Sequence, residues 1–156
     1  MAMEKTVVLV KPDAFQRGLV GRIVARFERK GLKIIGMKMI QISPELAREH
    51  YAHLVDKPFY PGLEKFMTAD PILVFAVEGQ EAIEVVRKIV GVTNSRKAEA
   101  GTVRGDFSNS TGRNTIHASD SAETAEKELA RFFKPEELFD YKLMVWDYIY
   151  AEDEKE

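Results

Sequence analysis

Cationic residues gather between residues 87 and 117, a stretch with six Lys or Arg, two acids and a net charge of +4. Such a stretch is either a solvated basic face or a site that binds an anion. Arg87, Arg104 and Arg113 could converge on one cleft with Lys11, where their charges repel one another unless an anion is present. Each charge-assisted hydrogen bond to a phosphate adds about 1.5–3 kcal/mol, so the pattern favours a phosphate-bearing ligand. The stretch also offers two neutral hydrogen-bond donors, Thr93 and Asn114.

His117 is the candidate reactive group of this stretch. It lies in the segment IHASD, whose small residues leave room for a substrate. Ser119, Asp120 and Glu128 could orient its imidazole and fix the tautomer. A hydrogen-bonded structural histidine is the alternative interpretation. Beside several cations, however, a neutral imidazole is a natural phosphoryl acceptor, because the cations stabilise charge on the group that is transferred.

Other known nucleotide-binding and metal-binding motifs are weak or missing in this sequence. It contains no G-x-x-x-x-G-K-[ST] loop and no protein-kinase H-R-D or D-F-G motif. Residues 18–21 form one G-x-x-G, which could be half of a dinucleotide motif or the backbone clamp of some RNA-binding modules, although a turn that precedes a helix is favoured. His50 and His53 could ligate a metal, but no third ligand is evident, so helix surface or packing is favoured.

Hydrophobic periodicity places these residues on alternating strands and helices. The predicted strands are Thr6–Val10, Leu32–Ile42, Pro71–Val77 and Thr115–Ser119. The predicted helices are Val20–Lys30, Pro44–Val55, a short piece that ends at Ala69, Ala82–Val90, and one that runs from a capping box at Asp120–Glu123 to Phe133. Residues 57–62 and 93–115 are predicted loops, and the second is long enough to be either functional or disordered.

The order β-α-β-α-β-α-β-α contains two β-α-β units. With helices on one face, these units predict an α/β fold of the α+β sandwich kind: a ferredoxin-like split β-α-β with an antiparallel four-stranded sheet covered by helices. A doubly wound parallel sheet is the alternative, because periodicity alone does not give the strand order. Residues 1–151 are predicted to form a single domain, and the acidic tail, residues 152–156, is expected to be disordered.

Composition excludes several classes of protein. The chain has 156 residues, of which 45% are hydrophobic and 31% charged, so a globular domain is expected rather than intrinsic disorder. It has no cysteine, which excludes disulfides, thiol nucleophiles and Cys-based metal sites. The net charge of -2 is concentrated in the acidic tail, and the near-neutral body counts against a nucleic-acid coat protein. No signal peptide or membrane-length apolar run is evident, so a soluble, cytoplasmic protein is expected.

Four segments together resemble the nucleoside diphosphate kinase family. They are KPDA with QRGL (residues 11–19), RFE (26–28), GTVRGDF (101–107) and RN-x-IHASDS (113–121). The resemblance extends from about Thr6 to Tyr150. It implies a ferredoxin-like domain that forms hexamers or tetramers. It also implies a ping-pong reaction that moves the γ-phosphate of a nucleoside triphosphate, typically ATP, to a nucleoside diphosphate through a phosphohistidine, with Mg²⁺ bound to the nucleotide.

The resemblance also implies roles for individual residues. Five residues would be catalytic. His117 would be the nucleophile, Glu128 and Ser119 would hold its ring, and Lys11 and Tyr51 would complete the set. The nucleotide would contact Lys11, Phe59, Arg87, Thr93, Arg104 and Asn114, with Lys11 and Asn114 near the ribose hydroxyls. Phe59 would stack on the base, which every base permits, so broad base specificity is expected. Core packing is the alternative for Phe59, but its setting in the loop KPFYPG favours exposure at a cleft. The magnesium ion would be held mainly by nucleotide phosphates, with no metal ligand from the protein.

The sequence departs from the commonest family pattern at four positions. Ser95 and Ala100 replace prolines of the basic loop, Ala118 replaces a glycine, and Thr111 stands where an apolar residue often closes the base site. All the predicted phosphate-binding positions match, so the activity is expected to survive. The reach of the chain past Trp146 resembles the longer members that form hexamers, and a hexamer is therefore favoured over a tetramer.

Two other functions would use the same residues. One is a nucleic-acid-binding module built on the basic loop and Phe59, and the other is a regulatory scaffold with little catalysis. The first lacks the aromatic motifs of RNA-binding sheets and a strongly basic body. We therefore expect nucleotides and further copies of the chain as partners, and neither a membrane nor a specific nucleic acid.

Overall fold

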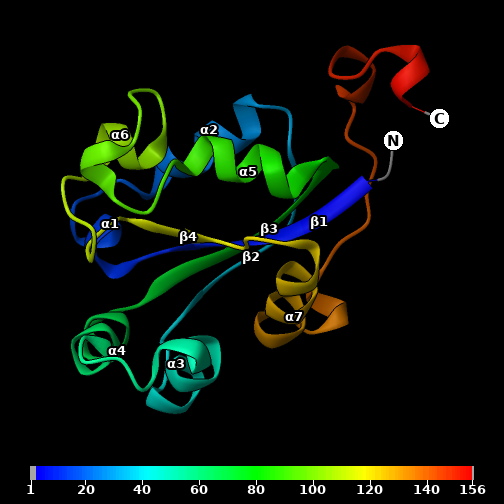
Figure 1. The fold of residues 1–156 in the computed structure, drawn as a ribbon. Helices are drawn as coiled ribbons and strands as arrows, with labels where there is room; N and C mark the ends of the chain where they lie inside the picture. Colours follow the sequence, from blue (N-terminus) through cyan, green and yellow to red (C-terminus); the bar gives the residue numbers. More distant parts are fainter. Residues whose placement is uncertain (1–2, 156) are drawn as a thin grey trace.

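The computed structural model describes residues 3–155, and its strands form one antiparallel sheet in the order β2-β3-β1-β4 (Figure 1). The strands are β1 (Met3–Val10), β2 (Lys33–Ile40), β3 (Ile72–Gln80) and β4 (Ile116–Ala118). The central strand β1 pairs with β3 from Met3 and Gln80 to Val10 and Leu73, and with β4 from Val8 and Ala118 to Val10 and Ile116. The antiparallel four-stranded prediction is therefore confirmed, and the parallel alternative is wrong.

Helices cover both faces of this sheet (Figure 1). They are α1 (Pro12–Gln16), α2 (Val20–Arg29), α3 (Pro44–His50), α4 (Tyr60–Ala69), α5 (Ala82–Val90), α6 (Val103–Phe107) and α7 (Ala122–Phe132). Figure 1 shows α2, α5 and α6 on one side of the sheet and α3, α4 and α7 on the other. The prediction of helices on a single face is wrong.

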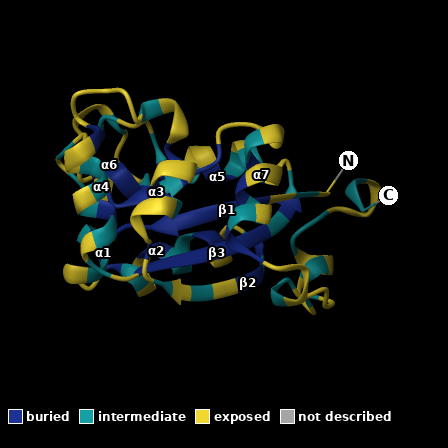
Figure 2. Ribbon diagram, turned by 90° about the horizontal axis from the view of Figure 1, so that it is seen from below, coloured by how far each residue is buried: buried dark blue, intermediate teal, exposed yellow. Residues whose placement is uncertain are grey.

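The apolar run of β1 is the physical reason for two helical layers. Residues 7–10 are completely buried, although successive side chains of a strand point to opposite faces. Val8 and Val10 belong to the core cluster that contains Ile23 and Phe27 of α2, together with residues of α5. Val7 and Leu9 belong to a second cluster with residues of α3, α4 and α7. Both faces of β1 therefore need a cover, and Figure 2 shows the buried central strands between exposed helices.

Several element boundaries differ from the predicted ones. The predicted helix Pro44–Val55 divides into α3 and a 3₁₀ turn at Ala52–Leu54. Helix α7 is capped by Ser121, whose Oγ accepts a hydrogen bond from the Thr124 amide at 3.1 Å, so the cap lies one residue after the predicted Asp120. The helical piece before Ala69 already begins at Tyr60, within the predicted loop.

The predicted loop at residues 93–115 contains a 3₁₀ turn at Ser95–Lys97 and the short helix α6. Thr102 begins α6, and its Oγ1 accepts a hydrogen bond from the Gly105 amide at 3.0 Å. The side chain of Arg26 on α2 donates to Asp106 at 2.5 Å. A capped turn tied to a neighbouring helix thus replaces the expected irregular loop, and it positions Arg104.

The C-terminal segment passes the start of β2 and the end of β3, and it contains 3₁₀ turns at Pro135–Glu137, Trp146–Tyr148 and Glu152–Glu154. The Phe139 amide donates to the Ile35 carbonyl at 2.7 Å. The predicted disorder of residues 152–156 stays a prediction, and Glu156 lies outside the described residues. No helix in residues 3–155 is long and apolar enough to cross a membrane.

Candidate active site

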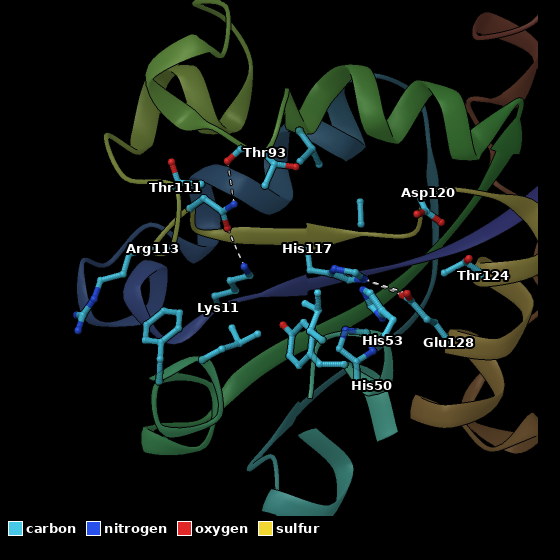
Figure 3. Close-up of a pocket in the computed structure, with 18 of the residues that line it drawn as sticks. Lys11, His50, His53, Thr93, Thr111, Arg113, His117, Asp120, Thr124 and Glu128 are labelled. Carbon is cyan, nitrogen blue, oxygen red and sulfur yellow. Dashed lines mark hydrogen bonds and ion pairs between the residues drawn. The ribbon is translucent and has the colours of Figure 1, made fainter. Parts of the chain in front are cut away.

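A pocket of about 1190 Å³ opens beside β4, and residues of α3, α4, α5, α6 and α7 contribute to its walls (Figure 3). Nine of the ten predicted site residues line it: Lys11, Tyr51, Phe59, Arg87, Thr93, Arg104, Asn114, His117 and Glu128. The tenth, Ser119, is completely buried. The structure therefore brings together in one place residues that the sequence spreads over more than a hundred positions.

His117 is held by a carboxylate from α7. Its Nε2 lies 2.8 Å and 3.0 Å from the two carboxylate oxygens of Glu128 (Figure 3). The Ser119 hydroxyl donates to the same carboxylate at 3.0 Å. Because a carboxylate only accepts hydrogen bonds, this contact places the ring proton on Nε2 and leaves the Nδ1 lone pair free. The half-buried imidazole is thereby fixed in the tautomer whose Nδ1 can act as a nucleophile.

Lys11 lies where strand β1 ends. Pro12 cannot donate to the sheet, so the strand stops there and α1 begins. The Lys11 Nζ donates to Asn114 Oδ1 at 2.7 Å, and Asn114 Nδ2 donates to the Thr93 carbonyl at 3.0 Å (Figure 3). Burial and the nearby Arg104 lower the pKa of Lys11 to about 8. Such a buried ammonium favours binding of an anion, because a nearby negative charge stabilises the protonated form and raises the pKa toward its usual value.

Arg104 has a structural role besides the predicted one. Its guanidinium donates to the carbonyls of Gly91 at 2.9 Å and Ile116 at 2.8 Å, and so ties the end of α5 to the start of β4. Burial, followed by repulsion from Arg87, lowers the pKa of Arg104 to about 10. Arg87 itself is exposed on α5 at the pocket wall. The two guanidiniums therefore differ: one is fixed by the fold, and the other is exposed to a ligand.

His50 lies against His117, a contact that the sequence did not predict. Its ring centroid is 4.6 Å from that of His117, with the rings nearly perpendicular. Arg131 donates to His50 Nδ1 at 3.0 Å, so the ring hydrogen lies on Nε2, which has no partner among the residues described. Burial, followed by the neighbouring His117 and Arg131, lowers the pKa of His50 to about 2. His50 is therefore a neutral, packed histidine. No sequence signal marks this contact, because Arg131 lies 81 positions away.

The same neighbours bear on metal binding. Potential ligand atoms of His50, His117 and Glu128 lie within 4.8 Å of one another. His117 Nε2 is already bonded to Glu128, and the Arg131 contact leaves a hydrogen on His50 Nε2. Each histidine is therefore hydrogen-bonded to its own neighbour, His117 to Glu128 and His50 to Arg131, and the two rings only pack against each other. His53, the other histidine weighed as a ligand, is exposed at the pocket wall.

Aromatic residues line other parts of the pocket. Phe59 is 58% exposed at the start of α4, so its predicted exposure at a cleft is confirmed. Tyr51 is buried, and burial raises the pKa of its phenol, which therefore stays protonated. The Arg113 guanidinium lies 5.3 Å from the centre of the Phe66 ring, away from His117 (Figure 3). Arg113 therefore borders the pocket at the end that holds the phenylalanines.

Comparison with known proteins agrees with this geometry. The family model for nucleoside diphosphate kinase matches residues 4–138. The chain belongs to the nucleoside diphosphate kinase family. The nucleoside diphosphate kinase of Parabacteroides distasonis is 53% identical over 97% of this chain and 99% of its own length. The solved structure of the Halobacterium salinarum nucleoside diphosphate kinase in complex with CDP superposes with a TM-score of 0.93 at 45% identity, and the match covers 96% of this chain and all of that one.

The four departures from the commonest family pattern lie in different surroundings. Ala118 is buried in β4 as part of the core cluster under α2 and α5. Ser95 is buried, and its hydroxyl has no hydrogen-bond partner within residues 3–155. Ala100 is exposed beside α6, and Thr111 is exposed at the pocket wall. Of the four, Thr111 and Ala118 line the pocket.

The nucleoside diphosphate kinase family implies a magnesium ion, and three carboxylates of the pocket are the side chains that could bind it. They are Glu49, Asp120 and Glu128. Glu128 is bonded to His117 and Ser119, and Glu49 lies 3.3 Å from Arg131. Asp120 is exposed, and Mg²⁺ in nucleotide sites commonly takes one or two carboxylates together with phosphates and waters. The lining therefore fits an ion held mainly by nucleotide phosphates.

Proposed function

We propose that this chain transfers the γ-phosphate of a nucleoside triphosphate, typically ATP, to nucleoside diphosphates of any base through a phosphohistidine at His117. The observation that carries the proposal is the bond between His117 Nε2 and Glu128, at 2.8 Å, in a pocket that also holds Lys11 and Arg104. It leaves Nδ1 unprotonated next to cations that stabilise a transferring phosphoryl group.

The reaction has two half-steps. In the first, the Nδ1 lone pair of His117 attacks the γ-phosphorus, the bond from this phosphorus to the β–γ bridging oxygen breaks, and the nucleoside diphosphate leaves with the electron pair. In the second, a terminal oxygen of another nucleoside diphosphate attacks the same phosphorus and the N–P bond breaks. Glu128 stabilises the positive charge that develops on the imidazole, and Ser119 holds Glu128.

The remaining residues bind and orient the nucleotide. Arg87 and Arg104 contact phosphate oxygens, with a neutral donor from Thr93. Lys11 and Asn114, already bonded to each other at 2.7 Å, contact the ribose hydroxyls, and Lys11 also neutralises phosphate charge. Tyr51 is a neutral neighbour of the phosphate. The exposed ring of Phe59 stacks on the base, and this explains a broad base specificity because any base offers a stacking face.

Magnesium accompanies the nucleotide in this proposal. When bound, it neutralises phosphate charge and holds the triphosphate in one geometry. Asp120 is the pocket carboxylate open to the ion or to its waters. The protein needs no dedicated metal ligand, and the cations of the pocket complement the remaining charge.

Copies of the chain assemble into a homo-oligomer, with a hexamer favoured over a tetramer. Strand β2 is an edge of the sheet, and its Met37 and Met39 are exposed. In the C-terminal segment Met144, Val145 and Tyr148 are exposed as well. Unpaired edges and exposed apolar side chains are features that a partner surface can bury.

We place the protein in the cytoplasm, where nucleotides and magnesium are available.

Initial-rate kinetics test this function. A coupled assay would follow ADP release from ATP while the concentration of a nucleoside diphosphate acceptor is varied. A ping-pong route predicts parallel double-reciprocal lines, and a direct transfer in a ternary complex predicts intersecting lines. Replacing GDP by CDP as the acceptor should change kcat/KM little, because the base is bound by stacking.

A further inference from the structure

The backbone next to the reactive histidine is strained. Thr115 has a φ of +68°, in the left-handed region that β-branched residues rarely occupy. The Ile116 amide donates to the Asn114 carbonyl at 2.8 Å and closes a three-residue turn centred on Thr115. Turns of this size with a positive φ at the centre are rare. Such strain persists only where the surroundings hold it.

Residues that directly follow β1 hold this turn closed. Asp13 Oδ2 accepts a hydrogen bond from the Thr115 amide at 3.0 Å, across 102 positions of sequence. The Thr115 carbonyl in turn accepts a hydrogen bond from the Lys11 amide at 2.8 Å. Both backbone polar groups of Thr115 are therefore bound by the short segment that also carries the Lys11 ammonium.

The turn connects two parts of the pocket. Asn114 comes directly before it, and its side chain joins the Lys11 ammonium to the Thr93 carbonyl. His117 follows two residues after Thr115, on β4. Any opening of the turn would therefore displace Asn114 and His117 relative to each other and to Lys11.

We propose that Asp13 is a positioning residue for phosphoryl transfer, a role that rests on the proposed function of His117. Its hydrogen bond to the Thr115 amide offsets the strain of the turn, and the turn keeps Asn114 and His117 in the arrangement that transfer requires. Asp13 itself does not line the pocket that holds His117. It acts through the backbone.

A second role for Asp13 would need only its charge. Asp13 stands in the first turn of α1, where an acid interacts favourably with the helix dipole. The hydrogen bond to the Thr115 amide indicates a role for Asp13 beyond the interaction with the helix dipole. One oxygen, Oδ2, makes the bond, whereas the buried Oδ1 has no partner among residues 3–155. The two roles differ in what they require: the dipole needs a charge, and the turn needs an acceptor oxygen at one position.

Five variants separate these roles, and one of them is Thr115→Gly alone, the reference for the double variant. Asp13→Ala removes the acceptor, Asp13→Asn keeps an acceptor of the same shape without the charge, and Asp13→Ala combined with Thr115→Gly removes the acceptor from a turn that glycine adopts without strain. Glu45→Ala is the matched control, since Glu45 is an exposed acid in the first turn of α3. Each variant would be labelled by γ-³²P-ATP with Mg²⁺ in a single turnover, and folding would be checked by circular dichroism.

The proposal predicts that Asp13→Ala slows labelling by about tenfold, the size expected when a buried backbone donor loses its partner. Asp13→Asn should label within about threefold of the wild type, and Glu45→Ala within about twofold. Thr115→Gly should recover most of the rate that Asp13→Ala loses, measured against Thr115→Gly alone.

Three results would overturn it. They are wild-type labelling by folded Asp13→Ala, an equal loss with and without Thr115→Gly, and a loss in Asp13→Asn as large as in Asp13→Ala, which would assign the effect to charge. If Asp13→Ala does not fold, rescue of its folding and labelling by Thr115→Gly supports the proposal, and a double variant that also fails to fold overturns it. A wild-type protein that takes no label would contradict the proposed function instead, so the two failures are distinguishable.

Discussion

The hydrogen bonds around His117 assign opposite roles to its two ring nitrogens. Glu128 accepts from Nε2, and Ser119 donates to Glu128, so Nδ1 stays available. In Glu128→Gln the amide can accept from or donate to the ring, and no charge stabilises the imidazole as it becomes positive. We expect phosphohistidine formation to slow by about 10–100-fold, because a hydrogen bond to a charged group contributes about 1.5–3 kcal/mol.

Ser119→Ala is the matched comparison for Glu128→Gln. It removes one neutral hydroxyl from Glu128 and keeps the carboxylate, so the loss should correspond to about 1 kcal/mol. Rapid-quench labelling with γ-³²P-ATP measures both variants. A Glu128→Gln rate equal to that of the wild type would show that the carboxylate does not control His117.

The lowered pKa of Lys11 predicts a pH dependence. Since Lys11 has a pKa of about 8 in the nucleotide-free protein, its charge is present below this pH and disappears as the pH rises through it. The value of kcat/KM, which reports ionisations of the free enzyme, should therefore fall above about pH 8. The measurement is kcat/KM for ATP between pH 6.5 and pH 10.

Lys11→Arg serves as the control for this titration. A guanidinium stays protonated over the whole range, so this variant should be less active and show no such fall. A wild-type profile that stays flat up to pH 10 would mean that the charge of Lys11 does not assist nucleotide binding.

At the residue scale, residue type and local setting anticipated part of the site. Nine of the ten predicted residues line one pocket. The cations, His117 and the neutral donors follow from residue type and setting, whereas Tyr51 and Phe59 came only from the resemblance to the nucleoside diphosphate kinase family. The contacts of His50 with Arg131 and of Asp13 with Thr115 were not predictable. Each joins positions that lie 81 or 102 residues apart, and their approach depends on how the sheet folds.

At the scale of elements, Lys33 ties the C-terminal segment to strand β2. Its buried Nζ lies 2.7 Å from Glu78 on β3 and donates to the Tyr141 carbonyl at 3.0 Å. The same ammonium lies 5.5 Å from the centre of the Trp146 ring. One side chain thus joins two neighbouring strands to a segment more than a hundred residues later in the chain.

Lys33→Ala should lower the free energy of unfolding by about 1–3 kcal/mol, because Glu78 then keeps only the half-exposed Lys5, whose Nζ lies 3.7 Å away. Urea unfolding followed by circular dichroism measures this loss, and limited proteolysis should show faster cleavage after residue 140. Lys127→Ala breaks the exposed pair with Glu123 and should cost less than about 0.5 kcal/mol. Equal losses in the two variants would refute the role assigned to Lys33.

Element prediction succeeded where apolar patterns are long. The strands β1, β2 and β3 and the helices α2, α5 and α7 follow from such patterns. Two five-residue helices, α1 and α6, were missed because so short a helix shows less than two turns of periodicity. The unbroken burial of residues 7–10 requires helices on both faces of the sheet, whereas the sequence analysis expected helices on one face only.

At the scale of the whole molecule, the edge strand β2 bears on assembly. Met39 on this strand is 60% exposed, so the rest of the chain leaves most of this apolar side chain uncovered. If copies meet through this edge, Met39→Asp should shift the protein to a smaller assembly, because it places a charge in an apolar contact. Light scattering coupled to size exclusion measures the mass, and circular dichroism checks the fold. Thr68→Asp, on α4, is the control, and an unchanged mass for Met39→Asp would exclude this edge as a contact.

The most direct test of the proposed reaction is isolation of the phosphorylated protein. The wild-type chain would be mixed with Mg²⁺ and γ-³²P-ATP without an acceptor, and the labelled protein would then be treated with acid, with base, and with GDP or CDP. We predict a label that is lost in acid, persists in base, leaves with either acceptor, and is absent from His117→Ala. A folded, nucleotide-binding protein that takes no label, or that keeps it after His117→Ala, would contradict the assignment of His117 as the phosphoryl carrier.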